Sequence, residues 1–335
     1  MSYFYKENLE LQRAVDTYFA QLSAYNDANF DGALSIILLG SLSRGEATWL
    51  QTDAGPVMVS DIEFFTVYPE GFTAFRQFDE AMADAARNVF PEQTSSLFHI
   101  DNTYVCRARL PYMERKLLTY DARMMGKTVV GQDDLTRLPL ITLENINRRD
   151  IRDILTHRIF AVLYYGLPLK EMGRTEQYRY CLAKNSLDLM TVMLVVHGQL
   201  ASGFINRLEQ IRRLPVDEKI KAYFEYCLSV KLGTEHPETY ATEEMEDLFI
   251  SIVRELDKQF RVPLVNMVRN GRHVIRRMLG MCKRAIQYRH LPRRGHLKQL
   301  IARFERKEHL TKMDLMDNLV RNGYPTMEKH HEDCE

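Results

Sequence analysis

Apolar and polar positions follow two different spacings along the first 140 residues. Apolar residues three or four positions apart predict helices, whereas short apolar runs bounded by glycine or proline predict strands. The predicted helices cover 9–24, 72–90 and 112–125, and the predicted strands cover 34–39, 57–68 and 97–105. This region is therefore expected to mix strands with helices.

Beyond Leu140 the strand pattern fades and helical spacing takes over. Predicted amphipathic helices cover 147–165, 176–197, 201–213, 217–232, 243–260 and 273–288. We therefore predict an α+β protein with two domains and a tail. A small mixed-sheet domain covers 1–140, an all-α helical bundle covers 141–325, and the tail covers 326–335.

Charge divides the chain in the same way. The 335 residues carry 45 Lys plus Arg and 45 Asp plus Glu, so the formal net charge is zero. Residues 1–150 hold 14 basic and 21 acidic residues (−7), which leaves 31 and 24 (+7) for the remainder. A neutral total argues against a protein that coats nucleic acid over its whole surface. The opposite net charges of the two halves indicate two domains that bind different charged partners.

The spacing of the cysteines and the length of the apolar runs indicate the cellular compartment. The five cysteines lie far apart and form no CxxC pair, which argues against a zinc ribbon or a disulfide framework. The first residues, MSYFYKENLELQ, lack the pattern of a signal peptide, and the apolar runs are too short to span a bilayer. We therefore expect a cytoplasmic protein without a membrane partner.

The strongest chemical pattern joins two predicted strands. The first ends in Gly40-Ser41, where glycine permits a tight turn and lets a phosphate approach the backbone. The second carries Asp61 and Glu63, which strand periodicity places on one face. Neighbouring carboxylates repel unless a cation lies between them, and their hard oxygens suit Mg²⁺ or Mn²⁺. The alternative is an ordinary strand-turn-strand with exposed acids.

These residues resemble the polymerase-β-type nucleotidyltransferase superfamily. Gly40-Ser41-Leu42-Ser43-Arg44, with Gly55-Pro56 and Ser60-Asp61-Ile62-Glu63, is locally most similar to aminoglycoside nucleotidyltransferases of the kanamycin type. The resemblance covers roughly residues 34–105. Ser41 and Asp61 are 20 positions apart, longer than is usual in the family, and an inserted loop is expected there.

The resemblance implies roles for individual residues. Asp61 and Glu63 would bind two Mg²⁺ ions, and Asp101 is the match for a third carboxylate that binds metal or takes the acceptor proton. The alternative is that Asp101 only begins a turn. In that case Asp121 is the candidate for the third carboxylate. Gly40, Ser41 and Arg44 would hold the nucleotide.

The helical domain is expected to close over the nucleotide. The superfamily often places a phosphate-binding lysine on such a helix, and Lys184 is the candidate, with a solvated surface lysine as the alternative. Arg44 is expected to contact phosphate, with an ion pair to Glu46 as its alternative.

A basic segment, Arg269–Lys307, holds thirteen basic residues and one acid, Glu305. Such a segment is a candidate for contact with nucleic acid or another polyanion. Its alternatives are pairing with acidic residues elsewhere and a solvated helix face.

The resemblance implies a metal-dependent enzyme that transfers a nucleoside monophosphate from an NTP, expected to be ATP, to an acceptor hydroxyl. The expected acceptor is a small molecule. The alternatives are a synthase of nucleotide second messengers in the same superfamily and a non-catalytic module that binds nucleotide or RNA.

Overall fold

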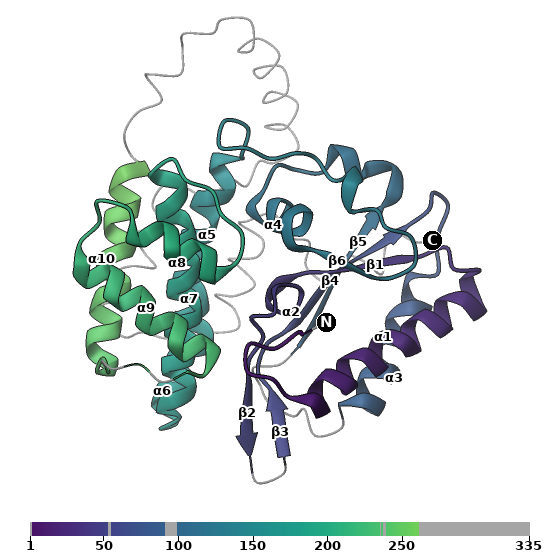
Figure 1. The fold of residues 1–335 in the computed structure, drawn as a ribbon, viewed down its shortest axis with the longest axis horizontal. Coiled ribbons are helices and arrows are strands. Elements are labelled where there is room, and N and C mark those ends of the chain that lie inside the picture. The colour runs from purple at the N-terminus through teal and green to yellow at the C-terminus, as the bar shows by residue number, and fades with distance from the viewer. Residues whose placement is uncertain (1, 53–54, 91–98, 235, 237–238, 261–335) are drawn as a thin grey trace, which may run out of the picture. The chain divides into compact units, whose positions relative to one another are not determined.

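The computed structural model describes residues 2–52, 55–90, 99–234, 236 and 239–260 (Figure 1). The chain divides into two compact units, which we describe separately. Among the described residues, the first is formed by the chain up to Ile151 together with His197–Thr239, and the second by Arg152–Val196 together with Tyr240–Phe260. The helix predicted at 273–288 and the basic segment lie outside the described residues.

Six strands of the first unit form a mixed four-stranded sheet, in the order β5-β4-β1-β6, and a separate two-stranded ribbon. The strands are β1 (Ser35–Leu38), β2 (Trp49–Thr52), β3 (Gly55–Met58), β4 (Ile62–Tyr68), β5 (Ile100–Cys106) and β6 (Lys127–Val130). β1 is antiparallel to β4 and β6, whereas β4 is parallel to β5. The predicted α+β class, with a mixed sheet followed by a helical region, is confirmed.

Helices of the first unit come from two separate stretches of the chain. They are α1 (Leu9–Phe30), α2 (Gly40–Arg44), α3 (Phe75–Val89), α4 (Leu117–Met125), α8 (Phe204–Arg212) and α9 (Glu218–Leu232), with 3-10 turns at Arg107–Tyr112 and Leu135–Arg137. α5 (Arg148–Ala161) crosses from the first unit into the second. The predicted domain boundary at residue 140 stays a prediction, and the compact units differ from it because α8 and α9 group with the sheet.

Strand β4 separates two hydrophobic cores. Ile62 and Phe64 join the larger core with α1 and α3, which lie together against one face of the sheet (Figure 1). Phe65 and Val67 join a smaller core with Ala122 of α4 on the other face. Because side chains alternate along a strand, the odd-numbered positions of β4 share the face covered by α4.

The long interval between Ser41 and Asp61 contains α2 and the β2–β3 ribbon, which projects from one end of the main sheet (Figure 1). The ribbon is antiparallel, with a register from Trp49↔Met58 to Thr52↔Gly55. The single strand predicted over 57–68 was wrong, since the structure divides it into β3 and β4. Val59 donates its backbone N–H to Thr48 at 3.0 Å, outside the main sheet, so the pairing changes there. The expected insertion is thus an ordered ribbon.

The second unit is helical throughout its described residues. It contains most of α5, a π-helical turn at Val162–Gly166, α6 (Leu167–Glu171), α7 (Thr175–Val196) and α10 (Thr242–Phe260). Glu246 is 6% exposed and accepts hydrogen bonds from Lys170 Nζ (2.6 Å) and the Tyr178 hydroxyl (2.7 Å) at one oxygen. Burial, together with this carboxylate, raises the pKa of Tyr178 above its ordinary value. This glutamate is a neutralised part of the helical core.

Two further observations concern the compartment predictions. Within the described ranges, no helix combines the length and the apolar character needed to cross a membrane. The cysteines in the same ranges, Cys106, Cys181 and Cys227, are free thiols.

Candidate active site

The turn after β1 brings Gly40 against a carboxylate. Gly40 has φ +65°, a left-handed conformation that favours glycine. A β-carbon on Gly40 would lie 2.8 Å from Glu63 Oε2, closer than side chains tolerate. The neighbouring Leu39 N–H donates to the Glu63 carbonyl at 2.7 Å, which fixes the end of β1 to β4. Glycine therefore suits the left-handed backbone here, and a larger residue would also force the Glu63 carboxylate to shift.

The three carboxylates selected from the sequence gather on neighbouring strands. Asp61 directly precedes β4, Glu63 is the second residue of β4, and Asp101 is its partner in the parallel register with β5. Strand alternation places Glu63 and Asp101 on the face that α4 covers. The Asp61 side chain is 5% exposed, whereas that of Asp101 is 59% exposed. We call these three residues the carboxylate array.

A histidine that the sequence analysis missed lies among these carboxylates. His99 accepts a backbone hydrogen bond from Ile62 N–H at 3.0 Å, which places His99 beside Asp61 at the start of the β4–β5 ladder. Its Nδ1 lies 3.1 Å from Asp61 Oδ1, and its Nε2 lies 3.0 Å from Asp101 Oδ2. The signal was available, because His99 and Asp101 are two positions apart on one predicted strand.

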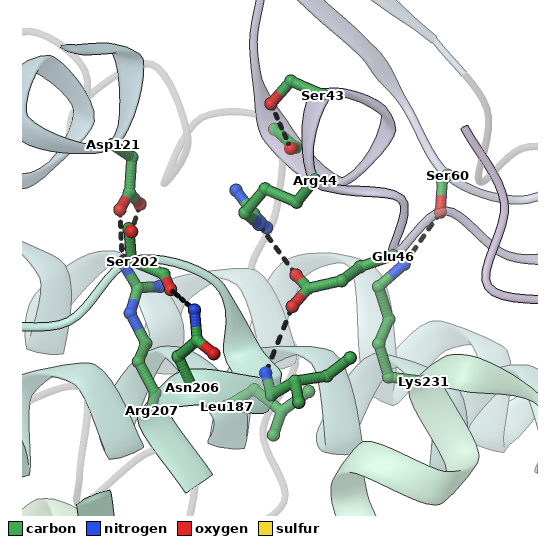
Figure 2. A network of polar contacts seen from close by, with 12 residues as sticks. Ser43, Arg44, Glu46, Ser60, Asp121, Leu187, Ser202, Asn206, Arg207 and Lys231 are labelled. Atoms are coloured by element: carbon green, nitrogen blue, oxygen red, sulfur yellow. Dashed lines mark hydrogen bonds and ion pairs between the residues drawn. The ribbon is translucent and has the colours of Figure 1, made fainter. Parts of the chain in front are cut away.

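A buried lysine holds the residue that precedes Asp61. Lys231 of α9 is 2% exposed, and its Nζ donates to Ser60 Oγ at 2.8 Å (Figure 2). Ser60 Oγ also accepts from the Thr48 backbone N–H at 2.9 Å, and the Thr48 hydroxyl donates to the Lys231 carbonyl. Thr48, Ser60 and Lys231 therefore tie α9 to the start of β4. No local pattern predicts a contact between residues so distant in the chain.

Arg44 makes the ion pair that was its alternative interpretation. Its Nε lies 2.7 Å from Glu46 Oε2, and the two side chains are 7% and 4% exposed (Figure 2). Burial lowers the pKa of Arg44, but the carboxylates of Glu46, Asp121 and Glu63 together raise it above its ordinary value. The guanidinium thus stays charged beside the array. Its contact with phosphate stays a prediction.

The same network joins α2 and α4 to α8. Glu46 Oε1 accepts the Ile205 N–H at 3.1 Å, in the first turn of α8. Arg207 of α8 binds both oxygens of Asp121 at 2.7 Å (Figure 2). Asp121, the substitute for the third carboxylate, is therefore engaged in an ion pair, whereas Asp101 lies in register with Glu63.

Lys184 lies on α7 in the second unit, where burial raises the pKa of the nearby Cys181 thiol and the charge of Lys184 partly opposes that rise. The two units are described separately, so its role at the phosphates stays a prediction. The half-buried Gly40 and Ser41 begin α2 beside Glu63.

The donor set of the array fits the metal that the resemblance implies. All three side chains offer hard carboxylate oxygens, which Mg²⁺ and Mn²⁺ prefer, and Glu63 is fixed against Gly40. Among the described residues, no three His, Cys, Asp or Glu side chains are arranged as ligands around one point. The imidazole of His99 lies between Asp61 and Asp101 in this conformation.

Comparisons with solved structures find several chains with a similar fold. No protein-family model and no curated protein matches the chain. The fold matches the crystal structure of spectinomycin adenyltransferase AAD(9) from Enterococcus faecialis with ATP and spectinomycin, at 14% identity and a TM-score of 0.47, over 72% of this chain and 98% of that chain. At this identity and TM-score, this match transfers neither an activity nor a ligand to this chain.

Proposed function

We propose that this chain is a metal-dependent nucleotidyltransferase that moves a nucleoside monophosphate from an NTP, with ATP as the expected donor, to an acceptor hydroxyl. One observation carries the proposal: Glu63 and Asp101 lie in register on parallel strands, with Asp61 beside them and Gly40 against Glu63. Three carboxylates gathered next to a glycine turn serve a cation and a phosphate better than they serve stability.

The reaction requires positioning of the triphosphate and acceptance of a proton. The acceptor oxygen bonds to the α-phosphorus, the bond from that phosphorus to the bridging oxygen breaks, and pyrophosphate leaves. Ser41 would donate its hydroxyl to a phosphate oxygen, while Gly40 leaves room for the phosphate beside the backbone. Asp101 is the most exposed carboxylate of the array and would accept the hydroxyl proton at an Oδ atom.

Asp61 and Glu63, with Asp101, would hold Mg²⁺ or Mn²⁺. When bound, these ions neutralise the triphosphate charge and lower the pKa of the acceptor hydroxyl. Lys231 would act as a positioning residue, because it fixes Ser60 and with it the backbone that carries Asp61.

Nucleotide binding tests the proposed site directly. Calorimetric titration with α,β-methylene-ATP, which resists cleavage at the reacting bond, is expected to give tighter binding with Mg²⁺ than without it. The double variant Asp61→Asn with Glu63→Gln is expected to lose this metal effect. Glu80→Gln with Asp84→Asn removes two carboxylates from the surface of α3 and serves as the matched control. Equal binding with and without Mg²⁺ in the unmodified protein would contradict the proposal.

A labelling experiment identifies the acceptor. The protein is incubated with ATP labelled at the α-phosphate, Mg²⁺ and fractionated cell extract, and the label is followed by chromatography. We propose that the label enters a small polar molecule. Label in oligonucleotides would instead indicate a second-messenger synthase, and no transfer despite metal-dependent binding would indicate a non-catalytic nucleotide-binding module.

A further inference from the structure

The buried ion pair of Arg44 leaves part of its guanidinium available. Nε lies 2.7 Å from Glu46 Oε2, and the two side chains are 7% and 4% exposed. Within the described ranges of the chain, the guanidinium donates its hydrogen bond through Nε, and Figure 2 shows a terminal nitrogen on the side away from Glu46. The terminal amino groups therefore keep their N–H donors for another acceptor.

Residues at the start of α8 hold this ion pair in place. Glu46 Oε1 accepts the Ile205 N–H at 3.1 Å, so both carboxylate oxygens are engaged. The Phe204 ring has its centroid 5.1 Å from Arg44 Cζ, within the range of a cation–π contact. Gly203 leaves room for the pair, because a β-carbon there would lie 3.1 Å from Glu46 Oε1. The guanidinium is therefore fixed at one edge and on one face.

The place of Arg44 on α2 brings it to the proposed nucleotide turn. α2 begins at Gly40 and ends at Arg44, so the arginine lies about one helical turn beyond Ser41, on the same side of the helix. Burial lowers the pKa of Arg44, but the surrounding carboxylates, Glu46 before the others, raise it above its ordinary value. A fixed cation with available N–H donors beside a glycine turn is suited to a phosphate group.

We propose that Glu46 is a positioning residue of the nucleotide site, which holds Arg44 by Nε so that its terminal amino groups meet a phosphate group of the NTP. Glu46 itself contacts no substrate and acts through Arg44. The hydrogen bond from Ile205 makes α8 part of this arrangement, although none of its residues was predicted to serve the nucleotide. This inference rests on the proposed function and deepens it.

A double-mutant cycle tests whether Glu46 acts through Arg44. Calorimetry with Mg²⁺ present gives the Kd for α,β-methylene-ATP. Arg44→Met is expected to raise this Kd by about 10-fold, and Glu46→Gln by about 5-fold, since a charged hydrogen bond to phosphate is lost or misplaced. The double variant is expected to match Arg44→Met. Glu225→Gln removes a carboxylate that pairs with Arg212 at the other end of α8 and is the matched control.

Adenosine separates positioning from a general loss of structure. It lacks phosphates, so its Kd, measured by saturation-transfer NMR, is expected to be the same in Glu46→Gln as in the unmodified protein. Gly203→Ala is a second variant that presses on Glu46 without removing it, and it is expected to raise the Kd for α,β-methylene-ATP by about 3-fold. Gly198→Ala is its control, because Gly198 has a similar φ, +75° against +78°, but nothing within 4 Å of its added β-carbon.

The outcomes distinguish this inference from the proposed function. An unchanged Kd for α,β-methylene-ATP in Glu46→Gln, or single effects that add up in the double variant, would overturn the positioning role. Equal weakening of adenosine would also overturn it, because Glu46 would then only support the fold. The proposed function survives these results if binding still depends on Mg²⁺ and on Asp61 with Glu63. Binding without Mg²⁺ dependence in the unmodified protein would overturn the proposed function and the positioning role with it.

Discussion

Two regions of this molecule gather charged side chains in opposite ways. In the second unit, the buried Glu246 meets Lys170 and the Tyr178 hydroxyl at one oxygen, so its charge is balanced by the protein itself. In the first unit, three carboxylates share neighbouring strands, and a half-exposed histidine lies between two of them. The Glu246 cluster is closed and balanced, whereas the carboxylate array carries excess negative charge and opens to solvent.

This comparison distinguishes charged residues that stabilise the fold from charged residues that are expected to bind a ligand. A buried ion pair with its hydrogen bonds satisfied holds helices together, and removal of one partner destabilises the fold. A group of like charges on rigid strands costs stability unless an external cation binds. Substitutions in the array are therefore expected to change function, and substitutions in the Glu246 cluster are expected to change stability.

The largest effect is expected for Asp61→Asn. Loss of this charge is expected to reduce kcat/KM by roughly 100- to 1000-fold, because charge stabilisation in the transition state is lost. The thermal midpoint is expected to stay the same or rise, since one of three repelling carboxylates is gone. Steady-state kinetics on the acceptor found by labelling, together with calorimetry, checks both. A large fall in the thermal midpoint would show that Asp61 stabilises the fold, which would contradict the proposed difference between the two regions.

The next effect is expected for Gly40→Ala. Its β-carbon would displace the Glu63 carboxylate, and kcat/KM is expected to fall by about 100-fold, as for other small misplacements of catalytic groups. Gly71→Ala is the matched control, because Gly71 also has positive φ, at +80°, but nothing lies within 4 Å of its added β-carbon. Equal activity loss in both variants would show that backbone strain, and not the carboxylate, is responsible.

Glu246→Gln tests the closed cluster. Lys170 would lose the buried Glu246 and keep only the exposed Glu243 at 3.5 Å as a charge partner. We expect the free energy of unfolding to fall by about 2 kcal/mol, roughly 30-fold in the unfolding equilibrium. Urea unfolding followed by circular dichroism measures the change. Glu244→Gln on the same helix removes a carboxylate outside the Lys170–Tyr178 contact and is the control. Unchanged stability with lost activity in Glu246→Gln would reverse the assignment of the two regions.

Lys231→Met combines the two kinds of effect. The apolar side chain keeps the volume of Lys231 but releases Ser60, so kcat/KM is expected to fall by about 10-fold through misplaced Asp61. Lys219→Met changes an exposed lysine on the same helix and is expected to leave kinetics unaltered. If Lys231→Met only lowers the thermal midpoint, Lys231 has a structural role alone.

The smallest effect concerns a thiol in the second unit. Burial raises the pKa of Cys181 from 9.0 to about 11, against the opposing effect of Lys184. The folded state therefore favours the protonated thiol, and this contribution to stability is present below pH 9.0 and is lost as pH rises towards about 11. At pH values below this window, iodoacetamide is expected to modify Cys181 more slowly than the half-buried Cys106, as measured by peptide mass spectrometry. Equal rates would show that this core is open to solvent.

Local patterns predicted the parts of the site that are close in sequence. Gly40 and Ser41 directly follow the buried strand β1 and its last neighbour Leu39, and the alternation around Glu63 identifies one face of β4. Asp101 followed from the resemblance and an imperfect strand pattern; it pairs in register with Glu63, and its role stays a prediction. These features depend on neighbours along one strand, which periodicity reports well.

Features that depend on distant residues were not predicted. Lys231 and Ser60 are 171 positions apart, so their hydrogen bond exists only after α9 packs in the first unit. β6 has only four residues, all between a helix and a turn, which is too short for a periodic signal. The ribbon was missed for the same reason, since its strands are four residues long and β3 begins with Gly55-Pro56, a pair typical of turns.

The ribbon also carries Trp49, the single tryptophan of the chain. Its indole N–H donates to the Lys6 carbonyl at 3.0 Å. Trp49 directly follows Thr48, whose backbone N–H donates to Ser60 Oγ. All indole fluorescence of this protein therefore originates from one place, close in the chain to the residues that hold Asp61. The molecule contains its own optical reporter, which records events at this end of the sheet without any attached dye.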